Sequence, residues 1–429
     1  MSILRTLNTG ATGLTANGDA LGVVGDNIAN ANTIGFKRSR ANFQDMVATA
    51  GRSELRQIGA GARLGSVEQM WQQGALLSTE SPTDLALSGD GFFVVHGNAS
   101  GVDGTFYTRA GQFHVDSSGY LVNMGKLRLQ GYEADDNGAI TGTVGDIRIG
   151  PTALPATATQ DIALAVNLDS TVLPAPPWDP ADPGSTSNFS TSVTSYDSLG
   201  NGHQIAIYFA NTGAGTWDWH AMTDGAEVVG GTAGVPFEGA SGSLSFTTDG
   251  ALDDEVVLGS NWDFVGATGG QVINFDFGTS ITGDGGTGFD GTTSFASPST
   301  TNGIVQNGFA AGSVSGIAVD ETGVITGVFS NGQRRTLGQV AVAAFRSVDG
   351  LSRAGGNLWV QTEESGEALI GAAATAGRGA INAGTLEQAN VDIGREFVDL
   401  IAYQRGFQAS SKVIQTADEL YGELVNLRR

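Results

Sequence analysis

Residues 3–28 read ILRTLNTGATGLTANGDALGVVGDNI, and residues 393–414 read IGREFVDLIAYQRGFQASSKVI. In both stretches, mostly apolar residues recur at alternating steps of four and three. The first set is Ile3, Leu7, Gly10, Leu14, Asn17, Leu21, Val24 and Ile28, and the second is Ile393, Phe397, Leu400, Gln404, Phe407, Ser411 and Ile414. Such a seven-residue repeat predicts a narrow stripe along an α-helix, which is typical of a coiled-coil seam. The two termini are therefore expected to pair, either with each other or with neighbouring copies.

The rest of the chain has the composition of a β-rich protein. Its 429 residues include 65 Gly but only 21 Lys plus Arg, and 40% are hydrophobic. Alternating runs predict short strands at residues 85–87, 91–95, 106–109, 112–115, 120–122, 192–195, 204–210, 216–221, 324–329 and 340–345. The dipeptides Asn302-Gly303 and Asn307-Gly308 predict turns. The predicted fold class is mixed α and β, with terminal α-helices forming a coiled-coil-like inner domain and nested, mainly antiparallel β domains.

Paired termini require the chain to run out and return, which predicts a nested order of domains. Residues 1–30 and 385–429 would form a terminal helical assembly domain, and residues 31–79 an extended or hairpin linker. Residues 80–150 and 301–384 would form a discontinuous inner β domain. Residues 151–300 would form an outer β domain inserted between its two pieces.

The charge of the chain excludes several classes of partner. The formal net charge is −23, and no Lys or Arg lies between Arg148 and Arg334. Nucleic-acid binding and attachment to anionic membranes depend on clustered basic residues, so neither is expected. No segment has the apolar length of a membrane span, so no membrane insertion is expected. The absence of Cys excludes disulfides and thiolate metal sites.

Several local motifs resemble chemical sites, but simpler interpretations are favoured. Residues 283–288 (GDGGTG) match a dinucleotide-binding glycine pattern, yet no helix pattern follows to hold a pyrophosphate, so a loop is favoured. Residues 253–255 (DDE) lack calcium-loop spacing and predict a solvated turn. The histidines lie in separate predicted strands and form no metal pair: His96, His114, His203 and His220. We expect no catalytic site, no metal and no cofactor, although distant carboxylates brought together by the fold stay open.

Two motifs near the ends resemble the signatures of the bacterial flagellar rod and hook family. The first is NIANANTIGFK at residues 27–37, and the second is LEQANVD at residues 386–392, followed by QRGFQA at 404–409 and KVIQTADE at 412–419. Some positions depart from the family pattern, with Ala389 where Ser is common and Ser410 where Asn is frequent. Gly394 and Gly406 each weaken a helix by about 1 kcal/mol relative to Ala.

The resemblance extends into the β-rich part of the chain. Residues 84–132 resemble the first β domain shared by the family, and residues 193–203 (VTSYDSLGNGH) are similar to an outer domain that shorter rod subunits lack. The resemblance implies a structural subunit that polymerises into the flexible, curved tube of the hook, couples rod to filament and transmits torque. A distal-rod subunit is the nearer alternative. A secreted β-rich binding protein or adhesin, trimerised by its helices, is the remoter one.

The same resemblance implies partners and a location. The partners would be further copies in a homo-polymer, the distal rod protein, the hook cap protein, the hook–filament junction protein and the type III export apparatus. The protein would lie outside the cell in the flagellar hook, attached to the basal body. Residues 1–10 lack the pattern of a secretory leader, so export without a cleaved signal peptide is expected.

The residues expected to carry subunit assembly combine the helical stripe with the two motifs. They are Ile3, Leu7, Leu14, Leu21, Val24, Ile28, Asn30, Asn32, Gly35, Phe36, Asn390, Val391, Asp392, Phe397, Leu400, Gln404, Arg405, Phe407 and Ile414. A lone helix with a thin apolar stripe is marginal in water. We therefore expect both ends to order only against neighbouring subunits, with a helix pair inside one chain as the alternative.

Overall fold

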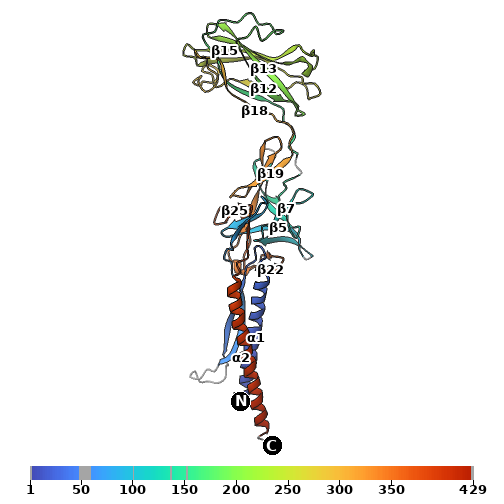
Figure 1. Cartoon of the computed structure of the whole chain (residues 1–429), viewed down its shortest axis with the longest axis vertical. Coiled ribbons are helices and arrows are strands. Elements are labelled where there is room, and N and C mark those ends of the chain that lie inside the picture. The colour runs from blue at the N-terminus through green and yellow to red at the C-terminus, as the bar shows by residue number, and fades with distance from the viewer. Residues whose placement is uncertain (1, 48–58, 100, 136–137, 151–152, 427–429) are drawn as a thin grey trace. The chain divides into compact units, whose positions relative to one another are not determined.

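The computed structural model describes residues 2–47, 59–99, 101–135, 138–150 and 153–426, without the side chains of residues 2–3 and 424–426. It divides the chain into two compact units (Figure 1). Unit 1 comprises Met1–Thr152, Ser315–Val328 and Arg334–Arg429, and unit 2 comprises Ala153–Val314 and Phe329–Gln333. Unit 2 is thus inserted between pieces of unit 1.

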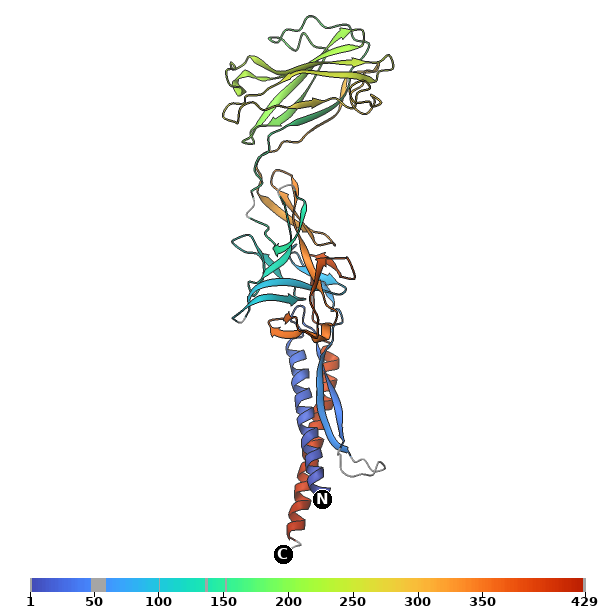
Figure 2. The same cartoon turned by 180° about the vertical axis from the view of Figure 1, so that it is seen from behind.

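Both termini are helical, and the two helices lie side by side (Figures 1 and 2). Helix α1 spans Ser2–Ala29 and helix α2 spans Ile393–Asn426. Asp392 caps α2, because its Oδ1 accepts a hydrogen bond from the Arg395 N–H at 3.2 Å, as the sequence predicts. The helices pair within one chain, which differs from our expectation that the ends order only against neighbouring subunits. The contacts that hold them together explain this difference and are described below.

A long hairpin lies along the helix pair (Figure 2). Its strands, β1 (Ser39–Val47) and β2 (Gly59–Gln69), pair antiparallel. The Phe43 ring centroid lies 5.7 Å from that of Tyr403 on α2. A Cβ added at Gly61 would collide with the Thr12 hydroxyl of α1, so the hairpin contacts both helices.

The β part of unit 1 interleaves strands from before and after the insertion. The strands before it are β3 (Leu76–Ser78), β4 (Leu85–Ser88), β5 (Phe92–Ala99), β6 (Val102–Thr108), β7 (Phe113–Val115), β8 (Leu121–Asn123), β9 (Arg128–Ala134) and β10 (Ile140–Asp146). Those after it are β19 (Val314–Val319), β20 (Val324–Phe329), β21 (Arg334–Ala344), β22 (Ser352–Gly355), β23 (Leu358–Val360), β24 (Leu369–Ala372), β25 (Ala380–Ala383) and β26 (Thr385–Glu387), with a short 3-10 helix, η2 (Val348–Gly350).

Strand β21 joins these two pieces into one sheet. It pairs antiparallel with both β5 and β9, and the main path runs β19-β20-β21-β9-β5-β6-β23-β22. The core beneath this sheet takes Phe93 and Leu129 from the first piece and Val342 from the second, all fully buried. Two smaller pairings, β4 with β25 and β3 with β26, also connect the pieces and lead towards the helices. Neither piece of this domain has a complete sheet alone.

Unit 2 contains two β-sheets packed over one core. A five-stranded antiparallel sheet has the order β12-β13-β14-β15-β16, and a three-stranded sheet has the order β17-β11-β18. Its elements are β11 (Asp161–Asn167), β12 (Phe189–Tyr196), β13 (Gly202–Gly213), β14 (Thr216–Asp224), η1 (Gly225–Glu227), β15 (Pro236–Phe246), β16 (Leu252–Ser260), β17 (Asn274–Asp276) and β18 (Thr300–Gln306). Ile162 from the smaller sheet and Trp219 from the larger one are fully buried in the shared core.

Three local predictions in this region are wrong. Asn302 and Gly303 form part of strand β18 rather than a turn, because Gly303 pairs with Ala165 of β11 in extended backbone. That pairing keeps β18 in unit 2, so the insertion runs beyond residue 300. Asn307 forms no turn either, since its side chain bonds the N–H groups of Gln160 and Asp161. Residues 253–255 lie in β16, paired with β15, rather than in a solvated turn.

Candidate assembly interface

The seam between α1 and α2 is built from small residues. A Cβ added at Gly10 would lie 2.8 Å from Cγ1 of Ile414, and one at Gly13 would lie 2.9 Å from the Ser410 hydroxyl. Farther along, a Cβ at Gly406 would lie 2.6 Å from Oδ1 of Asn17. Glycine at these positions lets the two backbones approach closely. The pair is therefore closely packed, and Ile414 and Phe407 of α2 lie against Gly10 and Gly18 of α1.

The predicted stripe only partly coincides with this seam. On α1, Val24 is buried, while Leu7, Leu14, Leu21 and Ile28 are half-buried. On α2, Leu400, Phe407 and Ile414 are half-buried, whereas Phe397, Gln404 and Arg405 are exposed. The side chain of Ile3 lies outside the described residues. The contact of α2 with α1 uses Ile414 and Phe407 of the stripe together with Gly406 and Ser410, which lie beside it.

Helix α2 carries large apolar side chains that the described residues leave uncovered. Phe397 is 50% exposed, Val398 is 66% exposed and Ile401 is 48% exposed. Residues four apart share a helix face, so Ile393, Phe397 and Ile401 lie together. We refer to Ile393, Phe397, Val398 and Ile401 as the exposed α2 face. The seven-residue repeat missed Val398 and Ile401, although the four-residue spacing from Ile393 is a signal that points to Ile401.

A second apolar surface lies nearer the C-terminus. Val413 and Leu420, both exposed, line an open groove of about 430 Å³ beside α1. The other lining residues are Thr6, Ala409, Lys412, Thr416 and Ala417. The helix pair thus presents apolar surface at two places along its length.

The two end motifs meet in a buried ionic joint. Lys37 Nζ donates to Glu387 Oε1 at 2.6 Å, and Arg109 Nη1 lies 3.5 Å from the other Glu387 oxygen. The side chains of Lys37 and Glu387 are 1% and 0% exposed. Burial lowers the pKa of both Lys37 and Arg109, and the charge of Glu387 opposes this effect in each case. Glu387 therefore supplies the negative charge that two buried cations require.

Backbone contacts tie the same motifs together. The Gly35 N–H donates to the Glu387 carbonyl at 2.7 Å. Gly35 has a φ of 70°, and a Cβ there would lie 2.5 Å from the Ala110 nitrogen, so a side chain does not fit. Asn390 accepts from the Arg38 N–H at 2.8 Å and donates to the Met70 carbonyl at 2.7 Å. The joint thus fixes where each helix leaves the β domain.

A further set of contacts anchors the helices beside this joint. Asn27 of α1 donates through Nδ2 to Glu396 of α2 at 3.0 Å and to the Ser39 carbonyl at 2.8 Å. Arg38 lies 3.2 Å from the other Glu396 oxygen. Asn27 and Glu396 are both buried. This contact network gives the helices a fixed starting point inside a single chain.

Most motif residues predicted for subunit assembly are engaged inside the chain. Gly35 and Phe36 are buried, and the Arg353 guanidinium lies 5.5 Å from the centre of the Phe36 ring. Asn30 donates to the Asp26 side chain at 2.9 Å, and Val391 is half-buried. Of the other motif positions, Asn390 belongs to the joint, whereas Asn32 and Asp392 are exposed. Burial leaves Gly35 and Phe36 no surface for a second subunit.

No grouping of ligands for a metal ion occurs within the described ranges. His96 and His114 are exposed in unit 1, and His203 and His220 lie in unit 2. Residues 283–288 form a loop without a helix after them. Among the helices of the described part, none combines the length and apolar character required to cross a membrane.

Family models match most of the chain. The match at residues 7–37 is to the flagella basal body rod protein, and that at 86–166 is to the D1 domain of flagellar hook protein FlgE/F/G. Residues 167–309 match the flagellar basal body protein FlaE D2 domain, and residues 382–427 match the C-terminal region of the flagellar basal body rod FlgEFG protein. In chain order, the four matches fall mainly on helix α1, the first β piece of unit 1, unit 2 and helix α2.

Two relatives that match over nearly their whole length have the same name. The flagellar hook protein FlgE of Borreliella burgdorferi is 36% identical over 99% of this chain and 100% of its own length. That of Escherichia coli is 32% identical over 97% of this chain and 98% of its own length. The crystal structure of Helicobacter pylori flagellar hook protein FlgE2, at 15% identity, shares the fold with a TM-score of 0.52 over 71% of this chain and 99% of that one. The chain therefore belongs to the flagellar hook protein FlgE family and is a structural subunit of the bacterial flagellar hook.

Proposed function

We propose that this subunit polymerises through its helix pair into a flexible, curved tube that joins the flagellar rod to the filament and transmits torque. The observation that carries this proposal is the exposed α2 face, where Phe397, Val398 and Ile401 are each about half-exposed or more. Full burial of a large apolar side chain stabilises by about 1.5–3 kcal/mol, so the rest of each side chain offers about 1 kcal/mol. A neighbouring subunit that covers this face would gain several such increments.

The partners follow from the place of such a tube in the flagellum. The subunit would meet further copies along the tube, the distal rod protein at one end, and the hook cap and hook–filament junction proteins at the other. It would be exported by the type III apparatus and assemble outside the cell. The proposed function requires no catalysis, no metal and no cofactor.

The acidity of unit 2 supports a compliant coupling. From residue 149 to residue 333 the chain has no Lys or Arg, whereas Asp and Glu recur throughout. Copies of such a unit repel one another, which opposes tight fusion between neighbours. If unit 2 lies at the outside of the tube, its contacts can slide as the tube bends. A stiff rod would not require this freedom.

Substitutions in the exposed α2 face test the proposal directly. In a strain that lacks its own copy of this gene, the double variant Phe397→Ser, Ile401→Ser should abolish hooks seen by electron microscopy and motility. Val102→Ser, which alters a 64% exposed apolar residue on β6, is the matched control and should assemble normally. Helical circular dichroism of the purified chains should be equal, since about half of each of these side chains is exposed.

The outcomes separate the candidate functions. Normal hooks from the Phe397→Ser, Ile401→Ser variant would contradict the proposed assembly surface. A straight, stiff polymer of the wild-type chain would contradict the proposed compliant coupling. Short, discrete oligomers would contradict polymerisation through the helix pair.

A further inference from the structure

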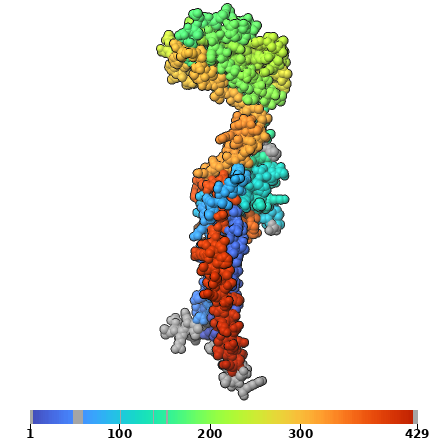
Figure 3. All heavy atoms as spheres, in the orientation of Figure 1, coloured from blue at the N-terminus to red at the C-terminus, as the bar shows by residue number. Residues whose placement is uncertain are grey.

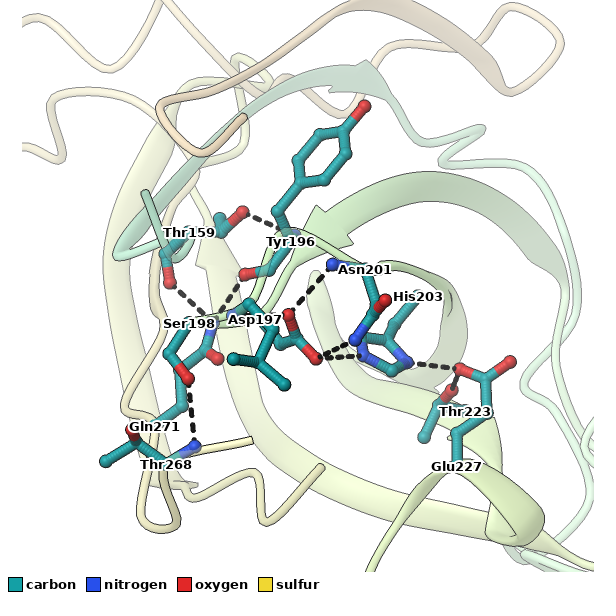
Figure 4. A network of polar contacts seen from close by, with 11 residues as sticks. Thr159, Tyr196, Asp197, Ser198, Asn201, His203, Thr223, Glu227, Thr268 and Gln271 are labelled. Carbon is teal, nitrogen blue, oxygen red and sulfur yellow. Dashed lines mark hydrogen bonds and ion pairs between the residues drawn. The ribbon is translucent and has the colours of Figure 1, made fainter. Parts of the chain in front are cut away.

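His203 lies between two carboxylates in unit 2 (Figure 4). Its Nε2 is 3.3 Å from Asp197 Oδ2, and its Nδ1 is 2.8 Å from Glu227 Oε2. Each ring nitrogen therefore faces one carboxylate. A neutral imidazole has one N–H and one lone pair, whereas the imidazolium has two N–H groups. Both contacts are therefore hydrogen bonds only when the ring carries its second proton.

The sequence stretch that contains His203 has no Lys or Arg to compete for the two carboxylates. Lys and Arg are absent from the whole of residues 149–333, so the two histidines of this stretch, His203 and His220, are its only basic side chains. The His203 ring stacks on Phe264, with 3.8 Å between centroids, and its side chain is 9% exposed. A protonated ring in this place attracts both carboxylates at short range.

The other groups on the elements around the ring are committed elsewhere. The Thr223 hydroxyl of β14 has one hydrogen, and its acceptors are the Gln204 carbonyl at 3.1 Å and Glu227 at 3.3 Å. Asp224 accepts the N–H groups of Ala226 and Gly234, and Asp263, beside Phe264, accepts from the Gly270 N–H. Asp197 and Glu227 are thus the titratable groups that face the ring.

Asp197 organises the turn between β12 and β13. Its carboxylate accepts from the N–H groups of Leu199 and Asn201 at 2.8 and 2.9 Å, and from the Asn201 amide at 2.9 Å. Ser198 in this turn accepts from the Thr268 N–H at 2.9 Å. Ser198 and Thr268 also line an open hollow of about 530 Å³. The position of Asp197 therefore affects both the turn and one wall of the hollow.

We infer that His203 is a proton-operated latch, which fixes the turn at residues 197–201 to η1 when the ring is protonated and releases it when the ring is neutral. Loss of one proton leaves a ring lone pair facing a carboxylate, so one contact changes from attraction to repulsion. The latch is closed at pH values where Asp197 is ionised and His203 is protonated. It opens as pH rises and the ring loses its proton. This property goes beyond polymerisation and belongs to unit 2 alone.

Two measurements on the full-length monomer test the latch. Nuclear magnetic resonance of labelled histidine rings follows each titration, with exposed His96 and His114 as references inside the same molecule. Hydrogen exchange, corrected for its intrinsic pH dependence, follows the amides of Leu199, Asn201 and Thr268. We expect their protection to fall roughly tenfold as the His203 ring loses its proton, the scale of one charge-assisted hydrogen bond.

Variants distinguish the latch from a general effect of pH. His203→Gln, which donates from one end only, should make the protection of these amides independent of pH wherever Asp197 stays ionised. The matched control is His220→Gln, because His220 also stacks on an aromatic ring, that of Trp178, but faces one carboxylate, Glu238. This control should keep the pH response.

A third variant covers the case in which His203→Gln does not fold. Glu227 is 37% exposed, so Glu227→Gln preserves the core and should reduce the pH response to less than half. Protection that stays flat while the wild-type His203 ring titrates would overturn the inference. Loss of the response in His220→Gln as well, or a full response in Glu227→Gln, would overturn it too.

Discussion

Glu387 holds two distant parts of the chain together through one buried carboxylate. It belongs to the C-terminal motif, and it meets Lys37 of the N-terminal motif and Arg109 of the β domain. Removing such charges from water costs several kcal/mol per ion, so they are stable in the interior only when each has its partner. A chain whose termini fail to meet would leave Lys37 and Arg109 without this partner.

Replacing this carboxylate should weaken unit 1 substantially. We expect Glu387→Gln to lower the free energy of unfolding by about 3 kcal/mol, because it leaves buried cations without a counter-charge. Guanidinium denaturation followed by helical circular dichroism measures this change.

The control uses an ion pair of the same length at the surface. Glu68 lies 2.6 Å from Arg40, with side chains 38% and 52% exposed. Exposed pairs contribute little, so Glu68→Gln should leave the denaturation midpoint nearly unchanged. Equal losses for the two Glu→Gln variants would show that burial of Glu387 does not set its importance.

The lowered pKa of Asp197 predicts that unit 2 loses stability in acid. Burial by itself raises the pKa of Asp197, but hydrogen bonds from Asn201, His203 and Leu199 outweigh it and lower the pKa below the usual 3.8. A carboxyl with a lowered folded pKa stabilises above the unfolded pKa, and that contribution is lost as pH falls through the folded value. Hydrogen-exchange protection of unit 2 should therefore fall below pH 3.8, and Asp197→Asn should flatten the fall. An equally steep curve for the variant would contradict this.

At the scale of the helices, glycine has opposite effects on stability at different positions. Gly10 faces Ile414 across the seam, whereas nothing lies within 4 Å of a Cβ added at Gly22. We expect Gly22→Ala to stabilise α1 by about 0.5–1 kcal/mol through helix propensity alone. Gly10→Ala should lose this gain, because Ile414 must move. Thermal unfolding followed by helical circular dichroism compares the two, and an equal gain would mean that the seam is looser than the structure shows.

The sequence located the helices but only part of the faces that they use. Periodicity finds a helix because apolar residues recur with its pitch, and Asp392 marks the start of α2. The contact with α1 combines Ile414 of that pattern with Gly406 and Ser410, which an apolar pattern does not mark. The strand at Asn302 and Gly303 was missed for a related reason, since its partner Ala165 is far away in the chain. At that position, pairing with a distant strand outweighs the local preference of Asn-Gly for a turn.

At the scale of the whole molecule, the nested order could be reasoned from the paired ends, whereas the ionic joint could not. The joint brings Lys37 and Glu387 together from opposite ends of the chain, and spacing in the sequence carries no signal of that contact. The motifs that contain these residues pointed to the family without showing that they touch. The domain boundaries also needed the strand pairings.

Removing unit 2 should separate assembly from mechanics. We expect a chain in which a short Gly/Ser linker replaces residues 153–314 to polymerise, since the helix pair and the exposed α2 face belong to unit 1. The polymer should differ in stiffness or curvature, because the repelling acidic surfaces are gone. Electron microscopy measures both properties. Complete loss of assembly would show that unit 2 is required for the contacts between subunits.

The central claim is that the exposed α2 face is covered by a neighbouring subunit in the hook. Because the chain has no cysteine, Val398→Cys introduces a single thiol on that face. Leu173→Cys, at an 82% exposed position in unit 2, provides the control. Both thiols should react rapidly with a maleimide in the monomer, and in assembled hooks only the thiol at position 398 should become protected. Equally fast labelling at position 398 in monomer and hook would contradict the account.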